Sequence, residues 1–233
     1  RGLRAAVYAS NIASRVQQVR ERIEAACRRV ARDPEDVTLV AVSKTFPTEA
    51  VLEAYAAGIH DFGENRVQEA LPKIDAVRRQ LGHDQGPRFH LVGHLQSNKA
   101  RAAAGAFDVI QSVDSIRLLT LLADAAPRPL PVFIEVNLAR EPAKSGVASD
   151  GLDSLLAAAR PPRNISLQGL MAVPPRGAHP EDSRAWFIQL RKLAARYELP
   201  ALSMGMSDDF EVAIEEGATH VRVGRAIFGE RNV

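Results

Sequence analysis

Lys44 is the residue in this sequence whose type and position are best suited to covalent chemistry. It closes an apolar run that begins at Val37, and such a run is typical of a buried strand. An ammonium group at the end of a buried strand must be kept solvated or paired. Partial desolvation lowers the proton affinity of a lysine, so that its neutral amine can attack a carbonyl carbon. The alternative is a lysine whose side chain extends past the strand end into solvent.

Two turns near the end of the sequence have the residues of a phosphate site. In the first, a strand leads through Gly205 to Ser207 at the start of a helix, where backbone N–H groups and the helix dipole favour an anion. In the second, Gly224 allows the backbone after a strand to approach a ligand closely. Taken alone, Ser207 could equally be a helix cap. The second turn, one unit later, favours the phosphate site that barrel enzymes form after strands seven and eight.

Other catalytic or ligand-binding patterns are weak or absent. His90 and His94 are separated by the end of a strand and a turn, so we expect no metal site. The sequence has no Walker motif, no dinucleotide-binding fingerprint and no nucleophile elbow. Asn65 and Asn137 could orient a ligand or cap the loops that follow them.

The elements that would position these residues alternate between strands and helices. Apolar residues at helical spacing predict a first helix from about Ala5 to Ala31, which Asp33-Pro34 ends. Short apolar runs then predict strands at Val37–Ser43, Ile59–Gly63, Arg88–Val92, Phe107–Gln111, Pro131–Asn137, Ser166–Met171, Ala201–Met204 and His220–Val223. Helical patterns lie between them, at Thr48–Ala57, Arg66–Leu81, Asn98–Ala104, Ser115–Ala125, Gly151–Arg160, Glu181–Leu199 and Asp208–Glu216.

Eight strand–helix units in about two hundred residues predict one α/β domain, a (β/α)8 TIM-type barrel with the first helix as an addition. A doubly wound open sheet is the competing architecture. No linker or repeat divides residues 1–233. Because alternate side chains of a strand share a face, Val42 aligns with Lys44, and Arg222 aligns with Gly224. In a barrel, Lys44 and Arg222 would both point into the mouth.

The composition is that of an ordinary globular protein. Of its 233 residues, 46% are hydrophobic and 25% are charged, and the formal net charge is +2. Basic pairs such as Arg28-Arg29 lie on helical patterns with acidic neighbours, so we expect no nucleic-acid binding. The one cysteine, Cys27, can form no intrachain disulfide. No apolar stretch is long enough to span a membrane, and we expect a cytoplasmic protein without a membrane partner.

Four segments of the chain form a recognisable set, and they occur at Val40–Thr45, Phe62–Asn65, His90–Lys99 and Leu202–Gly229. Within the last of them, Ser203–Phe210 is the most specific. In type, order and spacing these segments resemble the YggS/PROSC family, the pyridoxal 5'-phosphate (PLP) homeostasis proteins. The resemblance implies a barrel like the amino-terminal domain of alanine racemase, with PLP bound as a Schiff base.

The resemblance also implies roles for individual residues. Lys44 would form the Schiff base, and Arg222 would face the pyridine nitrogen. Because an arginine there cannot accept a proton, that nitrogen would stay unprotonated and the cofactor would be a weak electron sink. The other implied residues would hold the phosphate, lie beside the ring or line the pocket, and they are Ser207, Gly224, Arg225, Asn65, Ser203 and Met204.

The chain departs from the family pattern at two positions. Arg66 stands where a tyrosine is frequent, and Arg225 stands where a hydroxyl residue is frequent. The second departure leaves a backbone contact with phosphate in place but puts the side-chain contact in doubt. Lys144, after the fifth strand, is either a second lysine that receives or releases PLP or a surface-loop lysine.

We predict a PLP carrier without catalytic activity that supplies PLP to apo-enzymes; the alternative is an amino-acid racemase. Racemization needs an acid or base on each face of the α-carbon. In enzymes like alanine racemase, a tyrosine of an added β-domain supplies one. We expect no such domain after Val233, and therefore a monomer. The tyrosines Tyr8, Tyr55 and Tyr197 all fall on predicted helices away from the mouth. A barrel enzyme that binds phosphosugars would use the phosphate site but leaves Lys44 less well explained.

Overall fold

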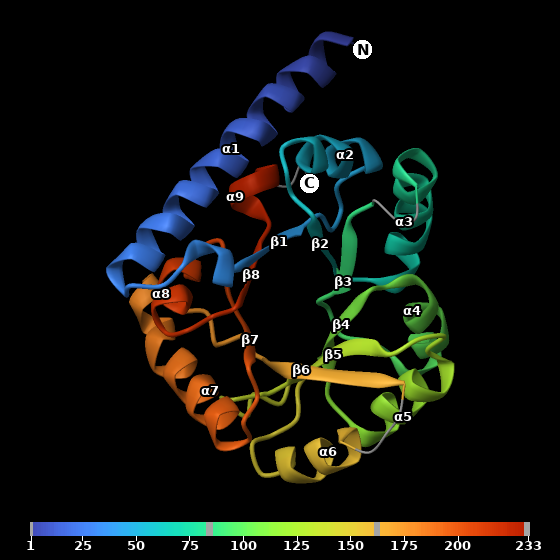
Figure 1. Cartoon of the computed structure of the whole chain (residues 1–233), viewed down its shortest axis with the longest axis vertical. Coiled ribbons are helices and arrows are strands. Elements are labelled where there is room, and N and C mark those ends of the chain that lie inside the picture. Colours follow the sequence, from blue (N-terminus) through green and yellow to red (C-terminus); the bar gives the residue numbers. More distant parts are fainter. Residues whose placement is uncertain (1, 83–85, 161–163, 231–233) are drawn as a thin grey trace.

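Eight parallel strands close into a barrel in the order β1 to β8 (Figure 1). This computed structural model describes residues 2–82, 86–160 and 164–230. The strands are β1 (Thr38–Val42), β2 (Asp61–Glu64), β3 (Arg88–Leu91), β4 (Val109–Val113), β5 (Leu130–Glu135), β6 (Ile165–Met171), β7 (Ala201–Met206) and β8 (His220–Val223). Because β8 pairs with β1, from Thr38 opposite His220 to Ala41 opposite Val223, the sheet has no open edge. The barrel prediction is confirmed, and the open sheet is wrong.

Helices surround the barrel and cover the outer face of its sheet (Figure 1). They are α1 (Gly2–Arg29), α2 (Thr48–Ala56), α3 (Val67–Leu81), α4 (Ala100–Ala106), α5 (Ile116–Ala125), α6 (Leu152–Ala159), α7 (Arg184–Arg196), α8 (Phe210–Glu215) and α9 (Arg225–Phe228). Short 3-10 helices occur at η1 (Pro34–Asp36), η2 (Ser97–Lys99) and η3 (Pro180–Ser183). None of the described helices is long and apolar enough to cross a membrane.

Helix α5 illustrates how the local sequence sets these elements. Ser115 caps its amino end, where the hydroxyl accepts a hydrogen bond from the Leu118 N–H at 3.3 Å. Leu118, Leu119 and Leu122 then recur at helical spacing and are fully buried against the barrel. The cap and the apolar stripe together fix where the helix begins and which face it buries.

The long helix α1 packs across α8, α9 and α2, as its course in Figure 1 shows. Its buried stripe includes Val16, Val19 and Ile23. At its edge, Arg22 Nε lies 2.6 Å from Glu211 of α8. The added first helix therefore covers the part of the barrel where β8 meets β1, which is the part that carries the candidate site.

The barrel interior is more polar than is usual for this architecture. Such interiors are ordinarily filled by layers of Val, Ile and Leu. Here a small apolar cluster of Val109, Phe133 and Met171 lies beside a set of buried polar side chains from five strands. That set consists of Asp61, His90, Gln111, Ser203 and Arg222.

The differences between predicted and observed elements are shifts of boundaries and two short helices that were not predicted, η1 and α9. The predicted strand at Phe107–Gln111 is displaced, because Phe107 packs in the outer core and the Asp108 carboxylate accepts the Phe89 N–H at 2.9 Å. Strand β1 ends at Val42, so Lys44 lies in the following turn. That residues 1–233 form one domain stays a prediction.

Candidate functional site

Lys44 lies just beyond the carboxyl end of β1, in a turn closed by the hydrogen bond from Phe46 N to Ser43 O at 3.1 Å. The next residue, Thr45, has a φ of 67°. Positive φ is costly for a β-branched residue, and such strain concentrates at functional sites. The Lys44 side chain is half-buried, in agreement with a lysine at the rim of the barrel.

A buried ion pair anchors the backbone before Lys44. Lys73, on the buried face of α3, donates to the Ser43 carbonyl at 2.8 Å and to Glu64 Oε1 at 2.7 Å. The Ser43 hydroxyl donates to the same Glu64 oxygen at 2.7 Å. Lys73 and Glu64 are 9% and 1% exposed, so each depends on the other for compensation of its charge. Sequence reasoning missed this pair, although a lysine among the apolar positions of α3 was the available signal.

The turn between β8 and α9 lies directly against the end of β1. A Cβ on Gly224 would lie 3.2 Å from the Val42 carbonyl oxygen, so glycine permits this close approach. The backbone N–H groups of Gly224 and Ala226 point at the Ser207 hydroxyl, at 3.3 and 3.4 Å. These long hydrogen bonds are weak, and the same amides could bind an anion oxygen. The turn and Lys44 thus occupy the same end of two adjacent strands.

The turn between β7 and α8 places Ser207 opposite those amides. Gly205 has a φ of 91°, and a Cβ there would lie 2.5 Å from the Ala213 Cβ. The Asp209 carboxylate accepts the Met206 N–H at 2.7 Å and the Ser183 hydroxyl at 2.8 Å. Glycine and Asp209 therefore fix the conformation of the turn that carries Ser207.

Arg222 is buried inside the barrel below the mouth and is 4% exposed. It donates to the Ser203 hydroxyl at 2.6 Å and to the Ala172 carbonyl at 2.9 Å. Burial lowers the pKa of Arg222 to about 10, partly offset by the charges of Glu135 and Asp209. The guanidinium stays cationic at neutral pH, and it has further N–H groups beyond these two.

The remaining predicted residues differ in how they relate to the mouth. Asn65 follows β2 and is half-buried. Gly93 packs closely against it, since a Cβ on Gly93 would lie 2.3 Å from the Asn65 carbonyl oxygen. Ser203 faces the interior with Arg222, whereas Met204, on the opposite face of β7, packs in the outer hydrophobic core. The roles that the resemblance implies for these three residues stay predictions.

The Arg225 side chain is held by acidic residues. Its guanidinium forms ion pairs with Asp208 and, at 3.5 Å, with Glu230. The side chain is 41% exposed. These pairings favour a role for the Arg225 backbone over its side chain in binding a phosphate.

Asn137 and Lys144 belong to one loop after β5. The Asn137 side chain donates to the carbonyls of Glu141 and Lys144, at 2.9 and 3.2 Å, and so caps the loop. Lys144 pairs with Glu141 at 2.7 Å and donates to the Pro174 carbonyl at 3.2 Å. Lys144 is thus a partly exposed loop lysine with two defined contacts.

Glu135, at the end of β5, is a buried carboxyl that sequence reasoning missed. Its Oε2 finds no hydrogen-bond partner among the described residues. Burial and the nearby charge of Asp114 raise the pKa of Glu135 to about 7, against the opposing effect of Arg222. A glutamate at a strand end carries no sequence signal for this, because the shift arises from burial and from Asp114, in the loop after β4.

The two histidines with metal-like spacing do not form a site. His90 is buried in the barrel interior, whereas His94 is 53% exposed and pairs with Asp114 at 3.6 Å. Within residues 2–82, 86–160 and 164–230, no group of three or more His, Cys, Asp or Glu side chains could hold a metal ion.

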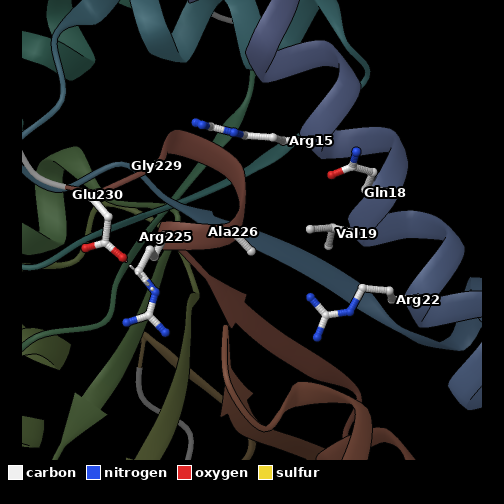
Figure 2. A pocket seen from close by; sticks show the side chains of 8 residues that line it. All are labelled: Arg15, Gln18, Val19, Arg22, Arg225, Ala226, Gly229 and Glu230. Atoms are coloured by element: carbon white, nitrogen blue, oxygen red, sulfur yellow. Dashed lines mark ion pairs between the residues drawn. The ribbon is translucent and has the colours of Figure 1, made fainter.

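A cavity of about 370 Å³ flanks the β8–α9 turn on the side of α1, outside the barrel (Figure 2). Its lining comes from α1 (Arg15, Gln18, Val19 and Arg22) and from the α9 region (Arg225, Ala226, Gly229 and Glu230). Arg22 and Arg225 are already paired with carboxylates. The cavity therefore borders the β8–α9 turn on the side of α1, and Lys44 is not among its lining residues.

Together these residues suit a small molecule that carries both a carbonyl group and a phosphate. Lys44 supplies an amine at the rim, the turn at Gly224 supplies backbone N–H donors, and Arg222 supplies a buried cation between the strands. Glycine at position 224 lets this turn lie against the β1 backbone at Val42, two residues before Lys44. PLP has this combination of groups, so the residues present fit it.

Comparisons with known sequences agree with this chemistry. Residues 14–232 match the family described as the alanine racemase N-terminal domain. The chain is 44% identical over 228 residues to a protein of Pseudomonas aeruginosa named pyridoxal phosphate homeostasis protein, covering 96% of this chain and 97% of that protein. It is 43% identical over 231 residues to the Escherichia coli protein of the same name, with 96% and 98% covered.

Solved structures extend the comparison. PipY of Synechococcus elongatus, determined with PLP bound, superposes with a TM-score of 0.80 at 38% identity, covering 94% of this chain and all of that one. Alanine racemase of Corynebacterium glutamicum has a TM-score of 0.70 at 17% identity, covering 97% of this chain and 62% of the enzyme. The second likeness concerns the fold alone.

Proposed function

The chain belongs to the family of pyridoxal phosphate homeostasis proteins, and we propose that it binds PLP at the barrel mouth and acts in PLP homeostasis. The observation that carries this proposal is the arrangement of a half-buried lysine and a glycine turn at the same end of the adjacent strands β1 and β8. The relatives' shared name and the PLP in PipY support the ligand.

Each end of the ligand would meet a different part of the site. Lys44 would hold the aldehyde end, and the backbone N–H groups at Gly224 and Arg225, with the Ser207 hydroxyl, would hold the phosphate. Arg222 would face the ring nitrogen as a cationic donor that cannot accept a proton. When bound, PLP supplies an aldehyde that combines reversibly with amines and a ring that withdraws electrons.

We propose that the protein carries and buffers PLP rather than catalysing a reaction of it. Tyr55 packs edge-on against His60, and the Tyr197 hydroxyl donates to Asp153 at 2.7 Å, so both are engaged on the outside of the barrel. Tyr8 lies outside the part of the chain whose side chains are described. Racemization would need a second acid or base at the reacting carbon.

Transfer to apo-enzymes and a cytoplasmic location complete the proposal. The single cysteine, Cys27, is buried in α1, and this suits a reducing compartment. A monomeric state stays a prediction, which light scattering of the full chain would test.

A titration with PLP followed by a transfer assay tests the proposal. We expect the full chain to develop the near-visible absorbance of lysine-linked PLP. The control variant Lys192→Ala, which replaces an exposed lysine of α7, should show the same absorbance. The loaded chain should reactivate an apo-form of a PLP enzyme without producing D-alanine or D-serine from the L-amino acids. Absence of binding would overturn the proposal, and rapid racemization would favour the enzyme alternative.

A further inference from the structure

Five buried polar side chains form an unbroken row through the barrel interior from Arg222 to Asp61. They come from β8, β7, β4, β3 and β2, and each is between 0% and 6% exposed. Buried polar groups are costly unless they are hydrogen-bonded. A row of this kind in place of an apolar layer therefore needs a specific arrangement of donors and acceptors.

The contacts link the five residues in one order. Arg222 Nη1 lies 2.6 Å from the Ser203 Oγ, which lies 2.6 Å from Gln111 Oε1. Gln111 Nε2 lies 2.9 Å from His90 Nδ1, and His90 Nε2 lies 2.8 Å from Asp61 Oδ1. The row ends at β2, where Asp61 pairs with the exposed Arg88 at 2.9 Å.

Arg222 sets the direction of the first hydrogen bond in this row, because a guanidinium can only donate. Ser203 therefore accepts from Arg222, and it donates its own hydrogen to the Gln111 amide oxygen, which can only accept. With its oxygen occupied, Gln111 presents its NH2 group to His90 Nδ1. The hydrogen bonds thereby assign the neutral His90 tautomer with its proton on Nε2, directed at Asp61.

Asp61 completes the row as an ionised acceptor. Burial alone would raise the pKa of Asp61, but the hydrogen bonds from His90 and Arg88 and the charge of Arg88 lower it below its usual value. A second histidine, His220, lies nearby with a ring-to-ring distance of 6.3 Å from His90. Burial lowers the pKa of His220 to about 4, so at neutral pH it adds no charge to the row.

We propose that Gln111 and His90 are positioning residues for PLP binding: through Ser203 they hold the Arg222 guanidinium in one orientation toward the ring nitrogen. This proposal rests on the proposed function. Gln111 takes the Ser203 hydrogen and so keeps the lone pairs of the hydroxyl directed at Arg222. Without Gln111, the hydroxyl can rotate, and its contact with the guanidinium is no longer fixed in one geometry.

The first test needs no PLP. In nitrogen-15 spectra of the full chain at neutral pH, we expect His90 to show an unprotonated Nδ1 and a protonated Nε2. The His90→Gln variant identifies its signals, and His60→Gln, at an exposed histidine, is the matched control. A His90 ring protonated on Nδ1 would overturn the assigned direction of the row and the proposal with it.

The second test measures PLP binding by absorbance and affinity. Gln111→Leu should weaken binding by about tenfold, the size expected for one lost hydrogen bond to a charged group, and should shift the near-visible band. Gln111→Glu, which keeps an acceptor for Ser203, should restore much of the affinity. Gln168→Leu is the control, because Gln168 bonds only to Ser166 among the described residues.

The two tests separate the positioning role from the proposed function. If the unmodified chain fails to bind PLP, the proposed function fails. If it binds PLP, but Gln111→Leu binds as tightly and with the same spectrum as Gln168→Leu, the positioning role alone is wrong. Loss of affinity in Gln111→Leu that Gln111→Glu does not restore would likewise contradict it.

Discussion

Lys44 is oriented by the backbone of its neighbours, and that backbone is fixed by side chains from other elements. Its turn contains the strained Thr45, and the carbonyl of Ser43 is held by Lys73. Residue 44 supplies an amine, and the buried pair of Lys73 and Glu64 holds the backbone from which its side chain extends.

Replacement of Lys73 should show how much the buried pair of Lys73 and Glu64 contributes to the stability of the fold. Lys73→Met leaves the Glu64 carboxylate buried without its cation, and we expect the free energy of unfolding to fall by about 3–5 kcal/mol. The double variant Lys73→Met/Glu64→Gln should recover part of that loss, because the uncompensated charge is gone. Urea unfolding of both variants measures the effect, and a loss below about 1 kcal/mol in the single variant would contradict it.

Glu135 should make stability depend on pH. Its pKa rises from 4.5 in the unfolded chain to about 7 in the folded one, so between these values the folded state binds more protons. The free energy of unfolding should therefore fall as pH rises through this window and stay low above it. Glu135→Gln should remove the fall, gaining about 2–3 kcal/mol over the unmodified chain above pH 7 and little below pH 4.5.

The control for Glu135 is a glutamate on the surface. Glu24→Gln, on the exposed face of α1, should change stability by the same small amount at every pH. Unfolding curves of both variants, collected across the pH range, measure this difference in pH dependence. Equal behaviour of the Glu135 and Glu24 variants would show that burial of Glu135 does not hold its proton.

At the scale of elements, glycine at the end of β7 and after β8 makes the geometry of the proposed phosphate site possible. Gly205 combines a positive φ with a Cβ position only 2.5 Å from Ala213. Gly217 has a similar φ of 95°, but the nearest atom to its Cβ position is 3.6 Å away. Alanine at position 217 would therefore introduce backbone strain alone, whereas alanine at position 205 would introduce both backbone strain and a steric clash.

Alanine at these positions should have unequal effects. Gly217→Ala should cost about 1 kcal/mol from strain alone and leave PLP affinity unchanged. Gly205→Ala should cost more than that and should weaken PLP binding, because the Ser207 turn must move away from Phe210 and Ala213. Thermal unfolding and PLP titration measure the two effects. Equal stability and affinity of both variants would contradict the role given to Gly205.

Much of the element order was predictable from the sequence, because apolar runs and breakers alternate clearly. The sequence also led to the prediction of Lys44, Ser207 and Arg222 as site residues, and the structure places each at or near the carboxyl end of a strand. The row from Asp61 to Arg222 was not predictable, because it joins strands from both ends of the chain. Such contacts depend on the register of a closed barrel, which local patterns do not specify. The Lys73–Glu64 pair joins consecutive elements, and its one sequence signal was a lysine among the apolar positions of α3.

At the scale of the whole molecule, closure of the barrel brings the first and last strands together, so residues near both ends of the sequence share the mouth. Figure 1 shows β1 beside β8, with α1 passing across α2, α8 and α9. A ligand that contacts both strands should therefore stabilise the closure itself. Binding to the folded state raises stability by mass action.

Addition of PLP should accordingly raise the thermal midpoint of the full chain. At a PLP concentration about a hundredfold above the dissociation constant, the expected gain is about 2.7 kcal/mol. Inorganic phosphate, which lacks the aldehyde and the ring, should give a much smaller rise. Differential scanning fluorimetry compares the two, and an equal rise with both would contradict a site that spans β1 and β8.

Covalent trapping of PLP on the full chain tests the central claim most directly. The protein is incubated with PLP, reduced with borohydride, digested and mapped by mass spectrometry. We predict one modified peptide, which contains Lys44, and its loss in Lys44→Ala. Modification at another lysine of the unmodified chain, such as Lys144, in place of Lys44, or an undiminished adduct in Lys44→Ala, would contradict the account.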